Sequence, residues 1–166
     1  QPRLAEGNRR EDIDMRKTLL VVAVFALAGS LFAADPIVGT WKVNVAKSSF
    51  GPGVQAPIRE QTNIVQEAGP DRYEIIVTGI LTSGTSFSYK AAYPKQGGAT
   101  IGAQTMQSVL KILAPGDWCF TSLQDGKQTG VNRVVVGKDG KSAVQTGRSP
   151  DASGKLMEGV LLFEKQ

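Results

Sequence analysis

The side chains that could perform chemistry are few, because the 166-residue sequence contains no histidine and a single cysteine, Cys119. The absence of histidine excludes a Ser-His-Asp triad, a Cys-His pair and a histidine-ligated metal site. Acid–base catalysis would then need paired carboxylates, and the candidate pairs are Glu60 with Glu74 and Asp117 with Asp125. We expect the glutamates on a solvated face and the aspartates in turns, and no cation is placed by sequence to activate Cys119. The sequence therefore predicts no enzyme activity, no catalytic residue, no metal and no other cofactor.

Residues that could bind a molecule are more numerous than residues that could react with one. Several aromatic and aliphatic side chains alternate along predicted strands and would line the interior of a small barrel, as in apolar ligand sites. The predicted ligand-binding residues are Tyr73, Phe87, Tyr89, Leu110, Trp118 and Phe120. Buried tyrosine hydroxyls need hydrogen-bond partners, and a ligand hydroxyl or carboxylate is one such partner. Arg133 is a candidate counter-charge if its face of the strand points inward.

The elements that must position these residues are strands almost throughout residues 35–166. Short segments with period-two alternation are separated by turn clusters, which is typical of an up-and-down barrel or a sandwich. Asp-Gly in "QDGK" (124–127) and in "KDGK" (138–141) predicts two hairpins with type I′ turns. We expect eight or nine antiparallel strands, at 38–45, 58–66, 72–81, 85–93, 106–113, 117–123, 128–136, 141–148 and 156–164. Sequential hairpins favour a meander that closes into a single antiparallel β-barrel, which has no free edges.

The alternation within these strands predicts which side chains point into the barrel. The inward sets are Tyr73, Ile75, Val77 and Gly79; Phe87, Tyr89, Ala91 and Tyr93; Leu110 and Ile112; Trp118 and Phe120; and Met157, Gly159, Leu161 and Phe163. The register of 131–136 is ambiguous, since valines occupy both faces around Arg133.

Residues 15–34 are predicted to be a secretory signal peptide ahead of the folded domain. Met15 is followed by two basic residues and then by a 17-residue apolar run, 18–34, that ends in small residues. Because this run is near the lower length limit of a membrane-spanning helix, an uncleaved anchor is the alternative. We expect cleavage without a stable membrane anchor, and therefore an exported protein, periplasmic or secreted. Residues 1–14 are expected to be a disordered upstream extension or, on an uncleaved anchor, a cytoplasmic tail.

The remaining segment, 35–166, is long enough for one domain with its own core. It carries 14 Lys and Arg against 11 Asp and Glu, a net charge of +3, and these charges are scattered along the chain. There is no basic block with interleaved aromatic residues, so nucleic acid is not an expected partner. One cysteine forms no internal disulfide, so the core must hold the domain together. We expect a monomer.

Both ends of this domain carry the residues of a known group. The sequence "GTWKVNVAKSSFGPG" (39–53), behind a signal-peptide pattern, resembles exported bacterial lipocalin-like domain proteins, an uncharacterised family with a Gly-x-Trp first strand. That group continues into Asn-x-Ala-Lys-Ser and ends in aromatic-Glu-Lys-Gln, and this chain has "NVAKS" at 44–48 and "FEKQ" at 163–166. The resemblance implies a lipocalin-like barrel.

The resemblance also assigns a structural role to the first strand. It implies that Trp41 packs as a plug inside the closed end of the barrel, covered by a basic side chain near the end of the last strand. This chain has no arginine after Arg148, so Lys165 is the residue left to cover the ring by a cation–π contact. Gly39 would let the chain approach the ring closely.

Two readings of the interior stay open at this stage. The nine aromatic residues of 35–166 either surround a cavity for a small hydrophobic or amphipathic molecule or fill the barrel outright. A filled barrel would instead favour a protein–protein interaction or inhibitor module that presents its loops. In the loop 46–57, Phe50 is then either an exposed interface anchor or a lid folded onto the barrel, and its burial distinguishes the two.

Overall fold

Strands form almost all of the regular structure in the computed structural model, which describes residues 34–51, 56–101, 107–150 and 156–166. The elements are β1 (Gly39–Val43), the 3-10 helix η2 (Val45–Lys47), β2 (Ile58–Glu67), β3 (Arg72–Leu81), β4 (Ser86–Pro94), β5 (Gly98–Ala99), β6 (Gln107–Ala114), β7 (Asp117–Gln124), β8 (Lys127–Val136), β9 (Ser142–Pro150) and β10 (Leu156–Lys165). The predicted signal peptide (15–34) and the extension over 1–14 lie outside the described barrel, which belongs to the unit Asp35–Gln166. None of the helical structure in the described ranges has the length and hydrophobicity that a membrane crossing requires.

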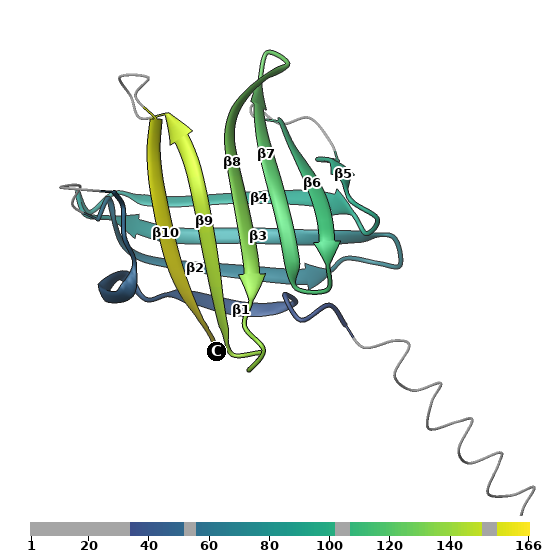
Figure 1. The fold of residues 1–166 in the computed structure, drawn as a ribbon, viewed down its shortest axis with the longest axis horizontal. Helices are drawn as coiled ribbons and strands as arrows, with labels where there is room; N and C mark the ends of the chain where they lie inside the picture. Colours follow the sequence, from purple (N-terminus) through teal and green to yellow (C-terminus); the bar gives the residue numbers. More distant parts are fainter. Residues whose placement is uncertain (1–33, 52–55, 102–106, 151–155) are drawn as a thin grey trace, which may run out of the picture. The chain divides into compact units, whose positions relative to one another are not determined.

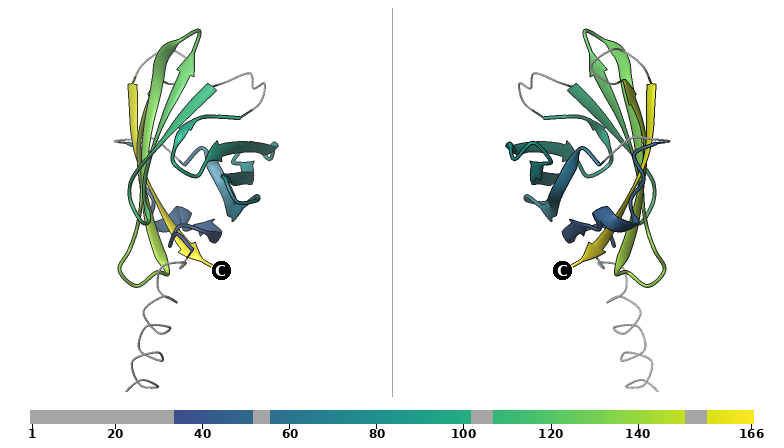
Figure 2. Two further views of the ribbon diagram at one scale, coloured as in Figure 1. Left: turned by 90° about the vertical axis from the view of Figure 1, so that its right-hand side faces the viewer. Right: turned by 90° about the vertical axis from the view of Figure 1, so that its left-hand side faces the viewer.

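The strands form one antiparallel meander in the order β4-β3-β2-β1-β10-β9-β8-β7-β6-β5. The first and last long strands pair, with Trp41 opposite Lys165, so the sheet curls back on itself. Strands β1–β4 cross the direction of β6–β10 and face them across the interior (Figures 1 and 2). The predicted all-β, up-and-down barrel is therefore confirmed.

The described part of the barrel has ten strands, whereas eight or nine were predicted. The additional strand is β5, whose two residues pair with Val109 and Leu110 of β6. It lies in a Gly-rich stretch without alternation, so the sequence pattern does not reveal it. The two ends of the meander, β4 and β5, come close to closing the barrel. Just after β5, the Ile101 N–H donates to the Ala92 carbonyl of β4 at 2.8 Å.

The two Asp-Gly turns differ in structure. Between β7 and β8, Asp125 and Gly126 have φ of 50° and 73°, and Gln124 pairs with Lys127. Positive φ at both central residues is the property of a type I′ turn, so this prediction is confirmed. Between β8 and β9, Gly140 has positive φ but Asp139 does not, so the type I′ prediction is wrong there. The Asp139 carboxylate instead accepts hydrogen bonds from the backbone N–H groups of Lys141 and Ser142, at 2.9 and 3.1 Å.

We predict that replacing Asp139 with alanine lowers stability at neutral pH and that the effect vanishes in acid. The hydrogen bonds from Lys141 and Ser142 lower the pKa of the Asp139 carboxyl below its ordinary value of 3.8. A carboxyl whose folded-state pKa is depressed stabilises the fold above its unfolded-state pKa and loses that contribution as pH falls through the folded-state pKa. Urea midpoints of wild type and Asp139→Ala should differ at pH 7, and the difference should shrink progressively as the pH falls below 3.8. A constant difference across this range would contradict the role of the charge, and Asp139→Asn serves as the neutral control.

Candidate ligand-binding site

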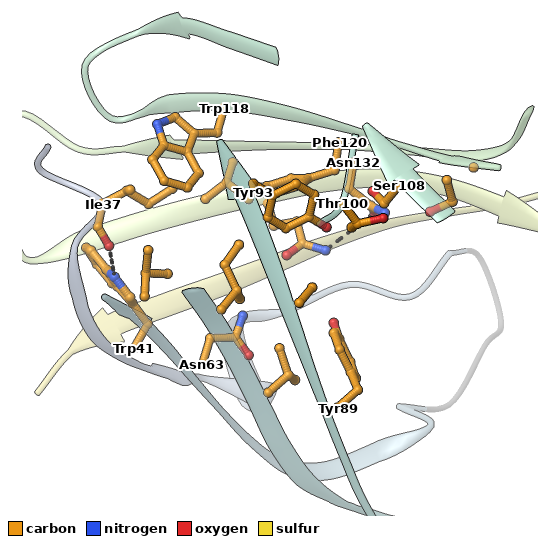
Figure 3. Close-up of a pocket in the computed structure, with 18 of the residues that line it drawn as sticks. Ile37, Trp41, Asn63, Tyr89, Tyr93, Thr100, Ser108, Trp118, Phe120 and Asn132 are labelled. Atoms are coloured by element: carbon orange, nitrogen blue, oxygen red, sulfur yellow. Dashed lines mark hydrogen bonds between the residues drawn. The ribbon is translucent and has the colours of Figure 1, made fainter. Parts of the chain in front are cut away.

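A cavity of about 1010 Å³ lies inside the barrel (Figure 3). It is within the size range of sites that enclose small organic molecules. Its wall comes from both halves of the meander and from the segment before β1. The lining residues are Ile37, Trp41, Asn63, Val65, Ile75, Val77, Tyr89, Lys90, Ala91, Tyr93, Thr100, Ser108, Trp118, Phe120, Ser122, Gln124, Thr129, Gly130, Asn132, Val134, Ala143, Gln145 and Phe163. The nine aromatic residues therefore do not fill the barrel.

One end of the cavity is apolar and closed. Trp118 is 0% exposed, and its ring packs on Tyr73 with a centroid distance of 4.7 Å. The Asp35 carboxylate accepts hydrogen bonds from Trp118 Nε1 at 3.2 Å and from the Gly116 N–H at 2.9 Å. These bonds hold the segment before β1 against this end of the barrel. Burial, with a smaller contribution from Asp35, raises the pKa of the Tyr73 hydroxyl. These contacts make a rigid, desolvated floor.

The structure brings Gly39, Trp41 and Lys165 together at the same end. Trp41 is 3% exposed and its Nε1 donates to the Ile37 carbonyl at 2.7 Å. Lys165 Nζ lies 5.0 Å from the centre of the Trp41 ring and donates to the Pro36 carbonyl. Gly39 has φ of 143°, and a Cβ there would lie 2.5 Å from Lys165 Cε. Trp41 also lines the cavity, so it forms part of the floor as well as closing the barrel.

The other end of the cavity is polar. Along β7 the inward side chains change from Trp118 and Phe120 to Ser122 and Gln124, which also line the cavity. Ser108 of β6 lies opposite Ser122 in the sheet and continues this polar surface. Figure 3 shows Ser108, Thr100 and Asn132 grouped away from Trp41, Ile37 and Trp118. The cavity is thus amphipathic along its length.

A pair of carboxamides stands beside this polar end. Gln145 Nε2 donates to Asn132 Oδ1 at 3.4 Å, and both side chains line the cavity. Asn132 lies opposite Gly147 in the β8–β9 ladder. A Cβ on Gly147 would lie 2.2 Å from Asn132 Oδ1, so the missing side chain is what makes room for the amide.

Two tyrosines of β4 extend the wall between the two ends. Tyr93 is 5% exposed and packs edge-on against Phe120 with a centroid distance of 5.6 Å. Burial raises the pKa of its hydroxyl, and a hydrogen bond to Ser108 opposes that shift. Tyr89 is 57% exposed by area, but its ring lines the cavity and its hydroxyl points into it (Figure 3). Partial desolvation there, with a smaller effect of Tyr93, raises the pKa of Tyr89.

The predicted ligand-binding residues divide into two groups in the structure. Tyr89, Trp118 and Phe120 line the cavity, whereas the other three pack beside it. Tyr73 is covered by Trp118, Leu110 is 2% exposed, and the Phe87 ring lies against Gly79. All six are on the inward faces that alternation predicts, but neighbouring side chains separate the second group from the open space. Contact of any of the six with a ligand stays a prediction.

Arg133 faces out of the barrel, so its possible role as an interior counter-charge is wrong. The β8 register places Asn132 and Val134 inward and Arg133 outward, where it forms two hydrogen bonds to the Asp117 carboxylate at 2.6 and 2.8 Å. Hydrogen bonding to Arg133 lowers the pKa of Asp117. This ion pair stabilises the outer surface and leaves no guanidinium in the cavity wall.

The carboxylates considered for catalysis do not form pairs. Glu60 lies opposite Ile80, whereas Glu74 lies opposite Gln66 and pairs with Lys90. Asp117 and Asp125 lie at opposite ends of β7. Cys119 is half-buried between the inward residues Trp118 and Phe120, and its sheet neighbours on either side are Lys111 and Arg133. Within the described ranges, no group of three or more acidic or cysteine side chains is arranged to hold a metal ion.

Phe50, the candidate interface anchor, is half-buried and packs against the hydrophobic core. Its neighbour Ser49 forms an isolated bridge to Val160 of β10, with backbone hydrogen bonds of 2.8 and 2.7 Å. The loop is therefore held on the barrel at this point, and the position favours a covering role for Phe50 over that of an exposed anchor.

Comparison with known proteins identifies the fold but no sequence family. No family model matches the sequence, and no curated protein sequence is similar to it. Among solved structures, the fluorescent protein UnaG is 15% identical with a TM-score of 0.52, over 78% of this chain and 97% of UnaG. The S-type phycobiliprotein lyase CPES from Guillardia theta is 10% identical with a TM-score of 0.55, over 79% of this chain and 89% of the lyase. The chain thus shares the antiparallel β-barrel fold of these proteins.

Most of the polar cavity wall lies outside the set of residues predicted from the sequence. The missed residues are Asn63, Thr100, Ser108, Ser122, Gln124, Thr129, Asn132 and Gln145. For β7 a signal was present, since Ser122 and Gln124 continue the alternation of Trp118 and Phe120. For β8 no such signal existed, because valines occur on both faces of 131–136.

Proposed function

We propose that this protein binds one small hydrophobic or amphipathic molecule inside its barrel and does not convert it chemically. The observation that carries the proposal is the cavity itself, about 1010 Å³ in volume, with an aromatic floor and a polar opposite end. Burial of an apolar ligand body against Trp41, Trp118 and Phe120 supplies the driving force, because apolar surface removed from water contributes about 25 cal/mol per Å².

Several features support binding over the alternatives. Eight- to ten-stranded barrels are wide enough to hold one small ligand, and the similar barrels of UnaG and the Guillardia theta lyase support this architecture for residues 35–166. The separation of Glu60 from Glu74 and of Asp117 from Asp125 leaves neither of these two carboxylate pairs able to act as an acid–base pair. The open interior also weighs against an interaction or inhibitor module built on a filled barrel.

We further propose that the protein is exported and acts as a monomer in the periplasm or outside the cell. The support is the basic start and apolar run of residues 15–34. An exported carrier of this kind would take up its ligand without a nucleic-acid or metal partner.

A fluorescence titration tests the binding function. N-phenyl-1-naphthylamine is an uncharged apolar probe whose emission rises in apolar surroundings, and both tryptophans of the chain line the cavity and report its arrival by quenching. We expect saturable binding of one probe per chain with a dissociation constant of about 1–10 μM, a common range for a modest apolar ligand. Emission that rises linearly, without saturation or tryptophan quenching, would overturn the proposal.

A further inference from the structure

We infer that the cavity selects ligands whose head group is uncharged and forms hydrogen bonds, such as a hydroxyl, carbonyl or carboxamide, on an apolar body. The inference rests on the proposed function and specifies the chemical class of its ligand. It excludes fatty acids and other simple carboxylates as preferred ligands.

The polar part of the wall consists of neutral side chains. Ser108, Ser122, Asn132, Gln145 and Tyr89 all line the cavity. Hydroxyl and carboxamide groups both donate and accept hydrogen bonds. Such a surface satisfies a neutral head group in either direction, and it carries no net charge to balance an ion.

The basic residue that lines the cavity is paired with a carboxylate on the outer face of the barrel. Among the described lining residues, Lys90 is the one with a formal charge, and its ammonium pairs with Glu74 at 2.5 Å. Lys90 alternates with the inward residues Tyr89 and Ala91, which places it on the outer face of β4. Arg133 is likewise paired outside, with Asp117. A carboxylate moved into this cavity would lose hydration without gaining a counter-charge, which is unfavourable.

The hydrogen-bonded carboxamides of Asn132 and Gln145 form a polar surface in the cavity wall that a ligand head group can contact. Gln145 donates one N–H to the Asn132 carbonyl oxygen, and the room for that oxygen exists because residue 147 is glycine. Within the described residues, this bond leaves the Asn132 amide hydrogens and the second Gln145 amide hydrogen as donors, and the Gln145 carbonyl as an acceptor, to meet a ligand. Paired amides of this kind match a group that both donates and accepts, which a carboxylate does not.

Two probes with the same aromatic skeleton test the inference. N-phenyl-1-naphthylamine is uncharged, and 8-anilino-1-naphthalenesulfonate adds one anionic group to the same rings. We expect the wild-type protein to bind the uncharged probe at least about 10-fold more tightly, a difference readily resolved by titration. Because the sulfonate also makes the second probe more soluble in water, the decisive comparison is between protein variants.

The variant Gln145→Lys places a cation beside the polar end of the cavity. It should raise the affinity for the sulfonated probe, relative to the affinity for the neutral probe, by about 10-fold or more, so the ratio of the two affinities is the quantity compared with wild type. The control is Thr146→Lys, which adds the same charge at the neighbouring, exposed position on the outer face and should alter neither affinity. Ser122→Lys, with Thr121→Lys as its partner control, repeats the test if Gln145→Lys fails to give a cooperative melt.

The binding results distinguish failure of the inference from failure of the proposed function. If wild type binds neither probe, the proposed function is overturned, and the inference falls with it. If wild type binds the sulfonated probe as tightly as the neutral one, or if the interior lysines leave its affinity unchanged, the inference alone is overturned.

Discussion

Replacing Trp118 with alanine is expected to lower the free energy of unfolding by about 3–5 kcal/mol, the usual cost of truncating a large buried aromatic residue. Trp118 is fully buried and contacts both Tyr73 and Phe120, with centroid distances of 4.7 and 6.2 Å. Its Nε1–H also holds Asp35, which secures the chain entering the barrel. The truncation would enlarge an existing cavity, so the surrounding side chains cannot easily collapse into the space.

Urea denaturation followed by far-ultraviolet circular dichroism measures this loss directly. Trp118→Phe is the matched control, because it keeps an aromatic ring and removes the bond to Asp35; we expect it to cost less than the alanine variant. A loss below about 1 kcal/mol for Trp118→Ala would show that the closed end is not the main stabilising part of the barrel.

Replacing Ala91 with tryptophan is expected to weaken probe binding by about 10-fold or more without unfolding the protein. Ala91 is 6% exposed and lines the cavity in the middle of β4, so an indole there would occupy space that a ligand needs. The cavity has room for the added ring, which avoids the overpacking that usually destabilises a filled core.

The neighbouring Ala92 supplies the control for this experiment. It is on the opposite face of β4, so Ala92→Trp adds the same side chain outside the barrel. Isothermal titration calorimetry with N-phenyl-1-naphthylamine should show wild-type affinity for Ala92→Trp and the loss for Ala91→Trp alone. Equal affinities for the two variants would place the bound probe outside the cavity.

The strands and their inward faces follow directly from local patterns. Tyr73, Val77 and Tyr93 are buried as period-two alternation predicts, and β3 has the predicted bounds. The prediction from alternation is correct here because a half-buried strand must present one apolar face to the core. Strand β5 could not be predicted, since two residues between glycines have no alternation and depend on pairing with β6.

The candidate site was predictable only in part, because its two halves depend on different information. The aromatic floor residues Trp118 and Phe120 stand out by size and spacing. The polar wall depends on register, since Asn132 enters the cavity and Arg133 leaves it only through the pairing of β8 with β9. The aromatic rings could either fill the interior or surround a cavity. The outcome depends on packing between strands that are distant in the sequence, and a local sequence pattern does not predict that packing.

A native mass spectrum recorded without detergent tests the binding account most directly. The protein should carry a reproducible added mass of a few hundred daltons as isolated, or take up one molecule of N-phenyl-1-naphthylamine when the probe is supplied. Release of the molecule on denaturation would then allow its identification. A bare chain mass both as isolated and after incubation with the probe would contradict the account.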